Sequence, residues 1–352
     1  MTFQPDYKNV QDAAFNRKPK RLPLYEHLVH DNVMEAVLNK KFADLYNGNL
    51  REKEEYFTHF CEFYKRLGYD AVSFECCIGG ILPNGGLLGG HGTSVIQTYA
   101  DFEKYPWGGL CDMYFEKFGD YFRALGNVLP PGMKAVGGVG NGVFEAVQDI
   151  MGYEHLAIIS YDAPDLYASL FKRMGDISLA IWERFFREYG DSYCVLRFGD
   201  DLGFKTNTLL PADDIRTHII PQYRRIVGLV HSYNKPFLLH SCGNLFDVMP
   251  DIISNAKINA KHSNEDIIAR FPVWVQKFGS QIAHFGGIDT DALCSLSPMQ
   301  VREYVNDVLK ECELIENAGA IAFGSGNSIP GYINLDNYLE MSNTVRAYRG
   351  DF

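Results

Sequence analysis

The sequence predicts an α/β fold, a (β/α)₈ TIM barrel, and three observations lead to this prediction. The chain has 352 residues, a common length for a barrel that forms one unit. Eight short apolar runs recur along it, each followed by a helical pattern, and eight strands that alternate with helices close a parallel barrel. Polar residues end these runs, as they do at the carboxyl ends of barrel strands, where active sites lie.

The predicted strands follow one another through the whole chain. They occupy residues 21–27, 71–75, 134–140, 194–203, 236–244, 258–263, 282–289 and 320–327. Their polar ends, in the same order, are His27, Glu75, Asn141, Asp200 with Asp201, His240 with Cys242, His262, Asp289 and Asn327. We expect these ends to meet on one face, although a strand end is also polar simply because it leaves the core.

A single domain is expected over 1–352, with 1–20 as an N-terminal extension. No internal repeat, low-complexity tract or Pro/Ser linker marks a boundary. A glycine-rich loop from Cys76 to Gly92 follows the second strand. It lacks the GxxxxGK[ST] pattern of a phosphate-binding loop, so a lid, a backbone wall against a flat substrate, or simple loop packing are the readings that remain.

Charge and composition limit the partners. The chain carries 44 Asp and Glu against 33 Lys and Arg, a net charge of -11, and has no basic run. We therefore expect neither nucleic acid nor a strongly anionic substrate. No secretory leader or apolar span of about 18 residues is evident, so we expect a cytoplasmic protein away from membranes, with its 8 cysteines reduced. Homodimer formation stays open.

The sharpest local signal is the segment from Phe237 to Asn244, Phe-Leu-Leu-His-Ser-Cys-Gly-Asn. Residues i and i+2 of a strand point to the same face, so the His240 imidazole and the Cys242 thiolate can reach one ion. A nitrogen and a sulfur donor together favour zinc. The alternative is a hydrogen-bonded core histidine beside a buried cysteine, and zinc would also need a third ligand.

Three segments carry a resemblance to a known family. They are Leu239–Asn244, Phe285–Asp289 (Phe-Gly-Gly-Ile-Asp) and Phe323–Ile329 (Phe-Gly-Ser-Gly-Asn-Ser-Ile). With the strand order around them, from about Arg21 to Tyr338, they resemble the uroporphyrinogen decarboxylase superfamily. That superfamily includes the decarboxylase, the methylcobalamin:coenzyme M methyltransferases and related corrinoid-protein methyltransferases.

The methyltransferase branch implies a zinc site. Its HxC pair on the fifth strand binds zinc, and His240 and Cys242 match that pair. The third ligand in the coenzyme M enzymes is a cysteine near the end of the eighth strand, where this sequence has Ser325, a poor zinc ligand. His262 or Glu265 on the sixth strand could replace it, as could Asp200 or Asp201, for which a capping or turn role is the alternative.

The decarboxylase branch fits less well. Its substrate carries many carboxylates, which paired arginines meet after the first strand, whereas this chain has the acidic end Tyr25-Glu26 there. The family's essential aspartate after the second strand falls at Cys76, beside Glu75. A tetrapyrrole pocket without those groups is hard to reconcile with electrostatics.

We therefore predict a zinc-dependent methyltransferase that moves a methyl group between a small substrate and a separate corrinoid (cobalamin) protein. With one thiolate lost, zinc is a stronger Lewis acid, which favours an oxygen substrate such as an aromatic methyl ether. Glu75 and Asp201 are predicted catalytic residues. The predicted substrate-binding residues are Cys76, Asp200, Asn141, Asp289, Ser325 and Asn327. A decarboxylase and a ligand-binding barrel without activity are the alternatives.

Overall fold

The computed structural model describes residues 3–88, 90 and 92–352. Its centre is one sheet of seven parallel strands in sequence order, each paired with the next. The strands are β1 (Val72–Cys77), β2 (Ala135–Gly140), β3 (Tyr193–Gly199), β4 (Phe237–His240), β5 (Ala260–His262), β6 (Ala283–Ile288) and β7 (Ile321–Ser325). The α/β class and the strand–helix alternation are confirmed, and the sheet curls as in a TIM barrel.

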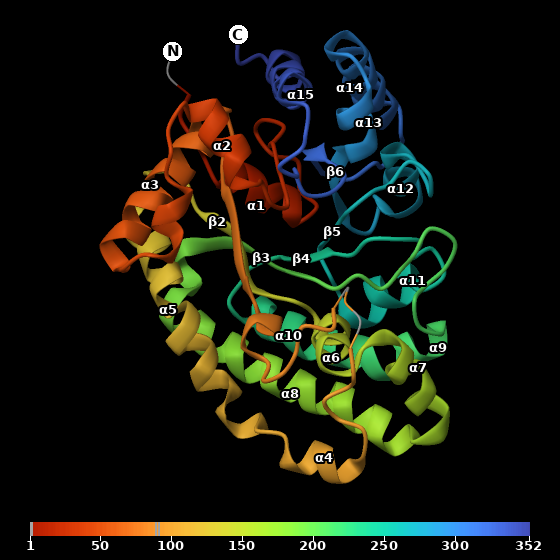
Figure 1. Ribbon diagram of the computed structural model, residues 1–352. Helices are drawn as coiled ribbons and strands as arrows, with labels where there is room; N and C mark the ends of the chain where they lie inside the picture. The colour runs from red at the N-terminus through yellow and green to blue at the C-terminus, as the bar shows by residue number, and fades with distance from the viewer. Residues whose placement is uncertain (1–2, 89, 91) are drawn as a thin grey trace.

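Helices surround the sheet. In Figure 1, α3 and α5 lie at the left, α8 and α10 below the strands, and α12 and α14 at the upper right. The helices are α1 (Lys8–Ala14), α2 (Asp31–Leu38), α3 (Leu50–Arg66), α4 (Tyr99–Lys104), α5 (Leu110–Val128), α6 (Val143–Met151), α7 (Tyr153–Asp162), α8 (Pro164–Tyr189), α9 (Ala212–Asp214), α10 (Ile220–Ser232), α11 (Met249–Asp251), α12 (Phe271–Phe278), α13 (Thr290–Ser295), α14 (Pro298–Glu313) and α15 (Leu335–Tyr348).

The expected first strand, 21–27, is not a regular strand. It touches β7 through a single parallel bridge, Leu24 with Phe323, and a second bridge joins Val29 to Ile329. Pro23 has no N–H to donate, so it contributes only its carbonyl, which accepts a hydrogen bond from the N–H of Phe323. The sheet therefore has seven strands in the described part of the chain, where the sequence predicts eight.

Side chains hold the segment 21–29 against β1. The carbonyl of His27 accepts hydrogen bonds from the Ser73 hydroxyl and from the Arg197 guanidinium, the latter over 3.1 Å. Arg197 also donates to the Tyr25 hydroxyl and to Ser73, both over 2.7 Å. We call this junction, made of Tyr25, His27, Ser73 and Arg197, the seam. The His27 carbonyl is thus hydrogen-bonded by side chains, where a regular strand would be hydrogen-bonded by the backbone of its neighbour.

The predicted N-terminal extension takes part in the fold. Helix α1 packs its small side chains Ala13 and Ala14, both fully buried, against the first residues of several strands. The Gln11 side chain donates to the carbonyl of Cys194, at the start of β3, over 3.2 Å. Helix α1 thus covers the amino end of the barrel, opposite the end where the predicted site residues lie.

Alternation along the strands divides the interior into two cores. The inner core is made of Tyr25, Val136, Val195, Leu238, Ala260, Phe285, Ala322 and the residues of α1. The intervening residues, such as Phe74, Leu196, Phe198, Leu239 and Phe323, pack under the helices in the outer core. The same alternation decides which polar side chains face the barrel and which face the helices.

Candidate functional site

Three predicted residues meet at the carboxyl ends of β3 and β4. The Cys242 sulfur lies 3.5 Å from His240 Nε2, and an Asp201 oxygen lies 3.7 Å from the same nitrogen. Their ligating atoms all lie within 4.8 Å of one another. Asp201 also accepts the N–H of Cys242 over 2.9 Å, which ties the loops after β3 and β4 together. We call Asp201, His240 and Cys242 the N/O/S group.

His262 fixes the orientation of His240. Its Nε2 lies 3.1 Å from the carbonyl oxygen of Ser325, so this nitrogen must carry the proton and donate it. A neutral imidazole then has a lone pair on Nδ1, and burial lowers the pKa of His262 to about 3. His262 Nδ1 lies 2.7 Å from His240 Nδ1, which is therefore the donor. The lone pair of His240 is left on Nε2, facing Cys242 and Asp201.

A second group of nitrogen donors adjoins the first. His27, His240 and His262 are buried with ring nitrogens within 4.8 Å of one another. The His27 ring stacks on His240 with centroids 3.7 Å apart and planes 10° apart. His27 was expected among the polar strand ends that meet on one face, but it was not predicted as a metal, catalytic or substrate-binding residue. His27 lies two positions after the inward-facing Tyr25, and this spacing is the sequence signal that could have placed it inside the barrel.

The Cys242 sulfur accepts two hydrogen bonds. Ser263 Oγ donates over 3.5 Å and Asn327 Nδ2 over 3.4 Å. Burial, and then the Asp201 carboxylate, raise the pKa of the Cys242 thiol. A thiolate at this position therefore needs a cation beside it, and the two donors would orient its remaining lone pairs.

Glu75 lies on the inner face of β1, where it forms a buried ion pair. Its Oε2 is 2.9 Å from Nε and 2.8 Å from Nη2 of Arg197 on β3. The Arg197 side chain is 0% exposed, so its charge is offset by Glu75 and by its neutral acceptors. Arg197 was not predicted as a site residue, although it lies two positions after the inward Val195.

Three predicted residues face the helical layer. Cys76 packs in the outer core beside Phe74. Asp200 accepts the N–H groups of Phe144 and Glu145 over 3.0 and 2.7 Å. This is the capping role given above as the alternative for Asp200. Ser325 is fully buried and donates its hydroxyl to Glu26. The prediction that they bind substrate stays untested, and their side chains point away from the N/O/S group.

The other predicted residues lie in loops after the strands. Asn141 accepts the N–H of Gly79 over 3.0 Å, and Asp289 caps α13 through the N–H of Asp291 over 2.7 Å. Glu265 accepts the N–H of Gly243 over 3.2 Å. Among the described residues, neither histidine-containing group includes Glu265. Asn327 alone of these touches the N/O/S group.

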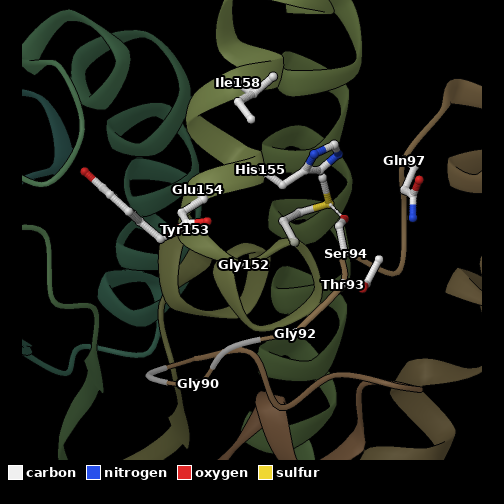
Figure 2. A pocket seen from close by; sticks show the side chains of 11 residues that line it. Gly90, Gly92, Thr93, Ser94, Gln97, Gly152, Tyr153, Glu154, His155 and Ile158 are labelled. Carbon is white, nitrogen blue, oxygen red and sulfur yellow. Dashed lines mark hydrogen bonds between the residues drawn. The ribbon is translucent and has the colours of Figure 1, made fainter.

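The glycine-rich loop packs on α6. Leu87 N–H donates to the Asp149 carbonyl over 3.0 Å and Leu88 N–H to the Asp149 carboxylate over 3.1 Å. A cavity of about 580 Å³ lies between the later part of this loop and the start of α7. Figure 2 shows His155 directed toward the loop and Tyr153 directed away from it. The described lining shares no residue with the N/O/S group. The predicted loop also contains Gly89 and His91, which lie outside the described residues.

No helix in the described part of the chain has the length and apolar character needed to cross a bilayer. The sequence matches no family model, and no curated protein matches it significantly.

Solved structures do resemble it. A methyltransferase from Methanosarcina mazei superposes with a TM-score of 0.75 and 13% identity, over 98% of this chain and 99% of that one. A rutinosidase from Aspergillus niger gives a TM-score of 0.41 and 9% identity over 93% and 97% of the two chains. A sugar phosphate isomerase/epimerase from Parabacteroides distasonis gives 0.40 and 9% over 92% and 94%. The first match shows a shared fold along the whole length.

Proposed function

We propose that this chain is a zinc-dependent methyltransferase of the uroporphyrinogen decarboxylase superfamily, which moves a methyl group between a small substrate and a corrinoid protein. The N/O/S group is the observation that carries the proposal, because it puts a nitrogen, an oxygen and a sulfur donor at the carboxyl ends of adjacent parallel strands. The shared fold with a methyltransferase supports it.

The three side chains suit zinc. A tetrahedral zinc ion with bonds of about 2.3 Å to sulfur and about 2.0 Å to nitrogen holds these two ligands about 3.5 Å apart. The Cys242 sulfur and His240 Nε2 are 3.5 Å apart. His262 leaves the His240 lone pair on Nε2, and Asp201 supplies the oxygen. Three protein ligands leave one position of a catalytic site for substrate.

Zinc bound there would draw charge from a substrate oxygen and make its methyl group easier to displace. The chain's own residues would prepare the site. Ser263 and Asn327 donate to the Cys242 sulfur and withdraw charge from it. With a single thiolate ligand, the site suits an oxygen substrate such as an aromatic methyl ether better than a thiol.

The net reaction is a demethylation. The methyl–oxygen bond breaks, both of its electrons stay on the oxygen, and the oxygen takes up a proton from water or from an acid of the site. The methyl carbon joins the cobalt(I) of the partner, which supplies the electron pair of the new bond and becomes methyl-cobalt(III). Glu75 is paired with Arg197, so we propose that it orients substrate as a hydrogen-bond acceptor.

The first test is metal content. The purified protein is expected to hold about one zinc per chain by elemental analysis, and His240→Ala, Cys242→Ala and Asp201→Ala are each expected to lose most of it. Cys294→Ala removes an exposed thiol and Glu265→Ala a nearby carboxylate, so both should retain zinc. Zinc lost from Glu265→Ala but kept by Asp201→Ala would assign the third ligand to the sixth predicted strand.

The second test is methyl transfer. Cob(I)alamin and a panel of aryl methyl ethers are incubated with the protein, and methylcobalamin is followed by its visible spectrum. Transfer that requires His240 and Cys242 supports the proposal. Zinc-loaded protein that transfers no methyl group from any ether, to cobalamin or to a purified corrinoid protein, contradicts it.

A further inference from the structure

A second cavity, of about 450 Å³, opens at the carboxyl end of the barrel on the side of the seam. It is lined by the segments 28–31 and 328–330, by β1, and by side chains of α3 and of the 3-10 turn Ala43–Asn47. Cavities of this size hold small molecules of drug-like dimensions. Glu75, which the proposed function gives a role in orienting substrate, is among its lining residues.

Two chain segments join this cavity to the N/O/S group. Leu28 lines the cavity, and its neighbour His27 stacks on His240 at 3.7 Å. Ser328 lines the cavity, and its neighbour Asn327 donates to the Cys242 sulfur. In each segment one residue contacts the N/O/S group and the next contacts the cavity. The segments 27–28 and 327–328 therefore contribute to both the cavity and the surroundings of the N/O/S group.

Aromatic rings form one wall of the cavity. Tyr46 and Tyr56 meet edge to face with centroids 5.0 Å apart, and Phe60 lies 6.0 Å from Tyr56 in a nearly parallel plane. Such faces bind a flat aromatic ring by offset or edge contacts. Ser73 and Ser328 also line the cavity, together with apolar residues of the segments 28–31 and 328–330.

The polar groups of the cavity are mainly acceptors. Asp31 Oδ1 accepts a hydrogen bond from the Tyr56 hydroxyl over 2.7 Å, and Oδ2 has no hydrogen-bond partner among the described residues. Glu75 lines the cavity as well and is paired with Arg197. No Lys or Arg is among the described lining residues, and the Nδ1 of His30, the one basic side chain there, donates to the Asn32 side-chain oxygen over 2.9 Å.

We infer that this cavity binds the methyl donor, and that the donor is an uncharged aryl methyl ether with a ring hydroxyl that donates to Asp31. The inference rests on the proposed function, because an ether oxygen has the lone pair that a Lewis acid needs and a quaternary ammonium has none. A ligand carboxylate would face Asp31 with no Lys or Arg among the described lining residues and be repelled.

Binding is measured by titration calorimetry on the full chain with guaiacol (2-methoxyphenol), vanillate and phenyltrimethylammonium. Vanillate is the same ring with an added carboxylate and is expected to bind at least about tenfold more weakly than guaiacol. Guaiacol should still bind, and its affinity should still depend on Tyr46 and Asp31, after zinc is removed with a chelator, because these two residues line the cavity and are not part of the N/O/S group.

Three variants assign the binding to this cavity. Tyr46→Ala is expected to weaken guaiacol about tenfold or more, and Asp31→Asn to bring vanillate within about threefold of guaiacol because it removes the repelling charge. Tyr153→Ala removes a tyrosine from the other cavity, shown in Figure 2, and should change neither ligand. Circular dichroism checks that the variants are folded.

The outcomes separate this inference from the proposed function. Guaiacol that does not bind, vanillate that binds as tightly, or phenyltrimethylammonium that binds more tightly overturns the inference. Methyl transfer from guaiacol that is unaffected by Tyr46→Ala and Asp31→Asn overturns it too and leaves the proposed function standing. Binding that depends on Tyr46 and Asp31, without any methyl transfer, supports the cavity assignment and contradicts the proposed function.

Discussion

At the scale of single residues, Asn327 occupies the place beside Cys242 that the family resemblance suggests for Ser325. The Asn327 amide lies 3.4 Å from the Cys242 sulfur, whereas the Ser325 hydroxyl is bonded to Glu26 in the outer layer. Ser325 is the last residue of β7 and faces outward, whereas Asn327 lies in the loop beyond the end of the strand, where the alternation of the strand no longer holds. The residue that replaces a second thiolate is thus Asn327 in this arrangement.

A cysteine at this position is expected to tighten metal binding. Asn327→Cys would place a second sulfur near Cys242, so zinc affinity should rise about tenfold or more, while transfer from an ether slows because the metal becomes a weaker Lewis acid. Competition with a chromophoric chelator measures the affinity. Ser325→Cys is the matched control and should leave affinity unchanged. If Ser325→Cys raises it instead, the placement of Asn327 in the site is wrong.

At the scale of elements, Asp200 joins the end of β3 to the first turn of α6. It accepts the N–H groups of Phe144 and Glu145, which have no partner within the helix, and the Tyr223 hydroxyl. A Cβ at Gly142 would collide with this carboxylate, so glycine at the N-cap of α6 makes room for a cap supplied from another strand.

Loss of this cap should destabilise the protein. Asp200→Ala leaves two buried N–H groups and one buried hydroxyl without an acceptor, which is expected to lower the free energy of unfolding by about 2–3 kcal/mol. Urea denaturation followed by circular dichroism measures the change. Asp213→Ala, where the side chain is 91% exposed, should stay within about 0.5 kcal/mol of wild type. Equal stability of the two variants would contradict the capping role.

The elements also show what the sequence could predict. Seven of the eight expected strands form, because apolar runs bounded by polar residues and helices are a strong pattern. The alternation of side chains along each strand could also have predicted which polar residues face the barrel interior. It separates the inward Glu75, His240 and His262 from the outward Cys76 and Ser325.

The contacts between strands could not be predicted in this way. Asp201 meets His240 because the loops after β3 and β4 bond to each other, and the His240–His262 contact depends on the register of β4 with β5. Arg197 looks from the sequence like a surface charge within a strand. Its full burial is possible only because four acceptors come from distant parts of the sequence, namely Tyr25, His27, Ser73 and Glu75.

At the scale of the whole molecule, buried acids make stability depend on pH. Glu26 is buried between Ser325 and Tyr69, and burial raises its pKa from 4.5 to about 7. Between these values the folded state holds a proton that the unfolded state has released. Stability contributed by protonated Glu26 is therefore present below about pH 4.5 and is lost as the pH rises to about 7, a change of about 3 kcal/mol.

Glu26→Gln is expected to flatten this slope. The free energy of unfolding, measured with urea at about pH 5 and pH 8, should fall less with pH in the variant than in wild type. Burial also raises the pKa of Asp200 to about 7, which adds a slope of the same sign to both proteins, so their difference isolates Glu26. Identical slopes would show that Glu26 is ionised throughout this range.

The contacts between the segment 21–29 and β7 also set the order in which the wall of the site can be completed during synthesis. The segment that carries His27 leaves the ribosome early, but its partners on β7 follow almost at the end of the chain; Glu26 and Ser325 are 299 positions apart. Contacts at such separation form late, because the intervening chain must be ordered first. A nascent chain that already has β1 to β6 therefore still lacks the strand that holds the other side of the segment 21–29, and this wall of the site is completed only when translation is nearly over.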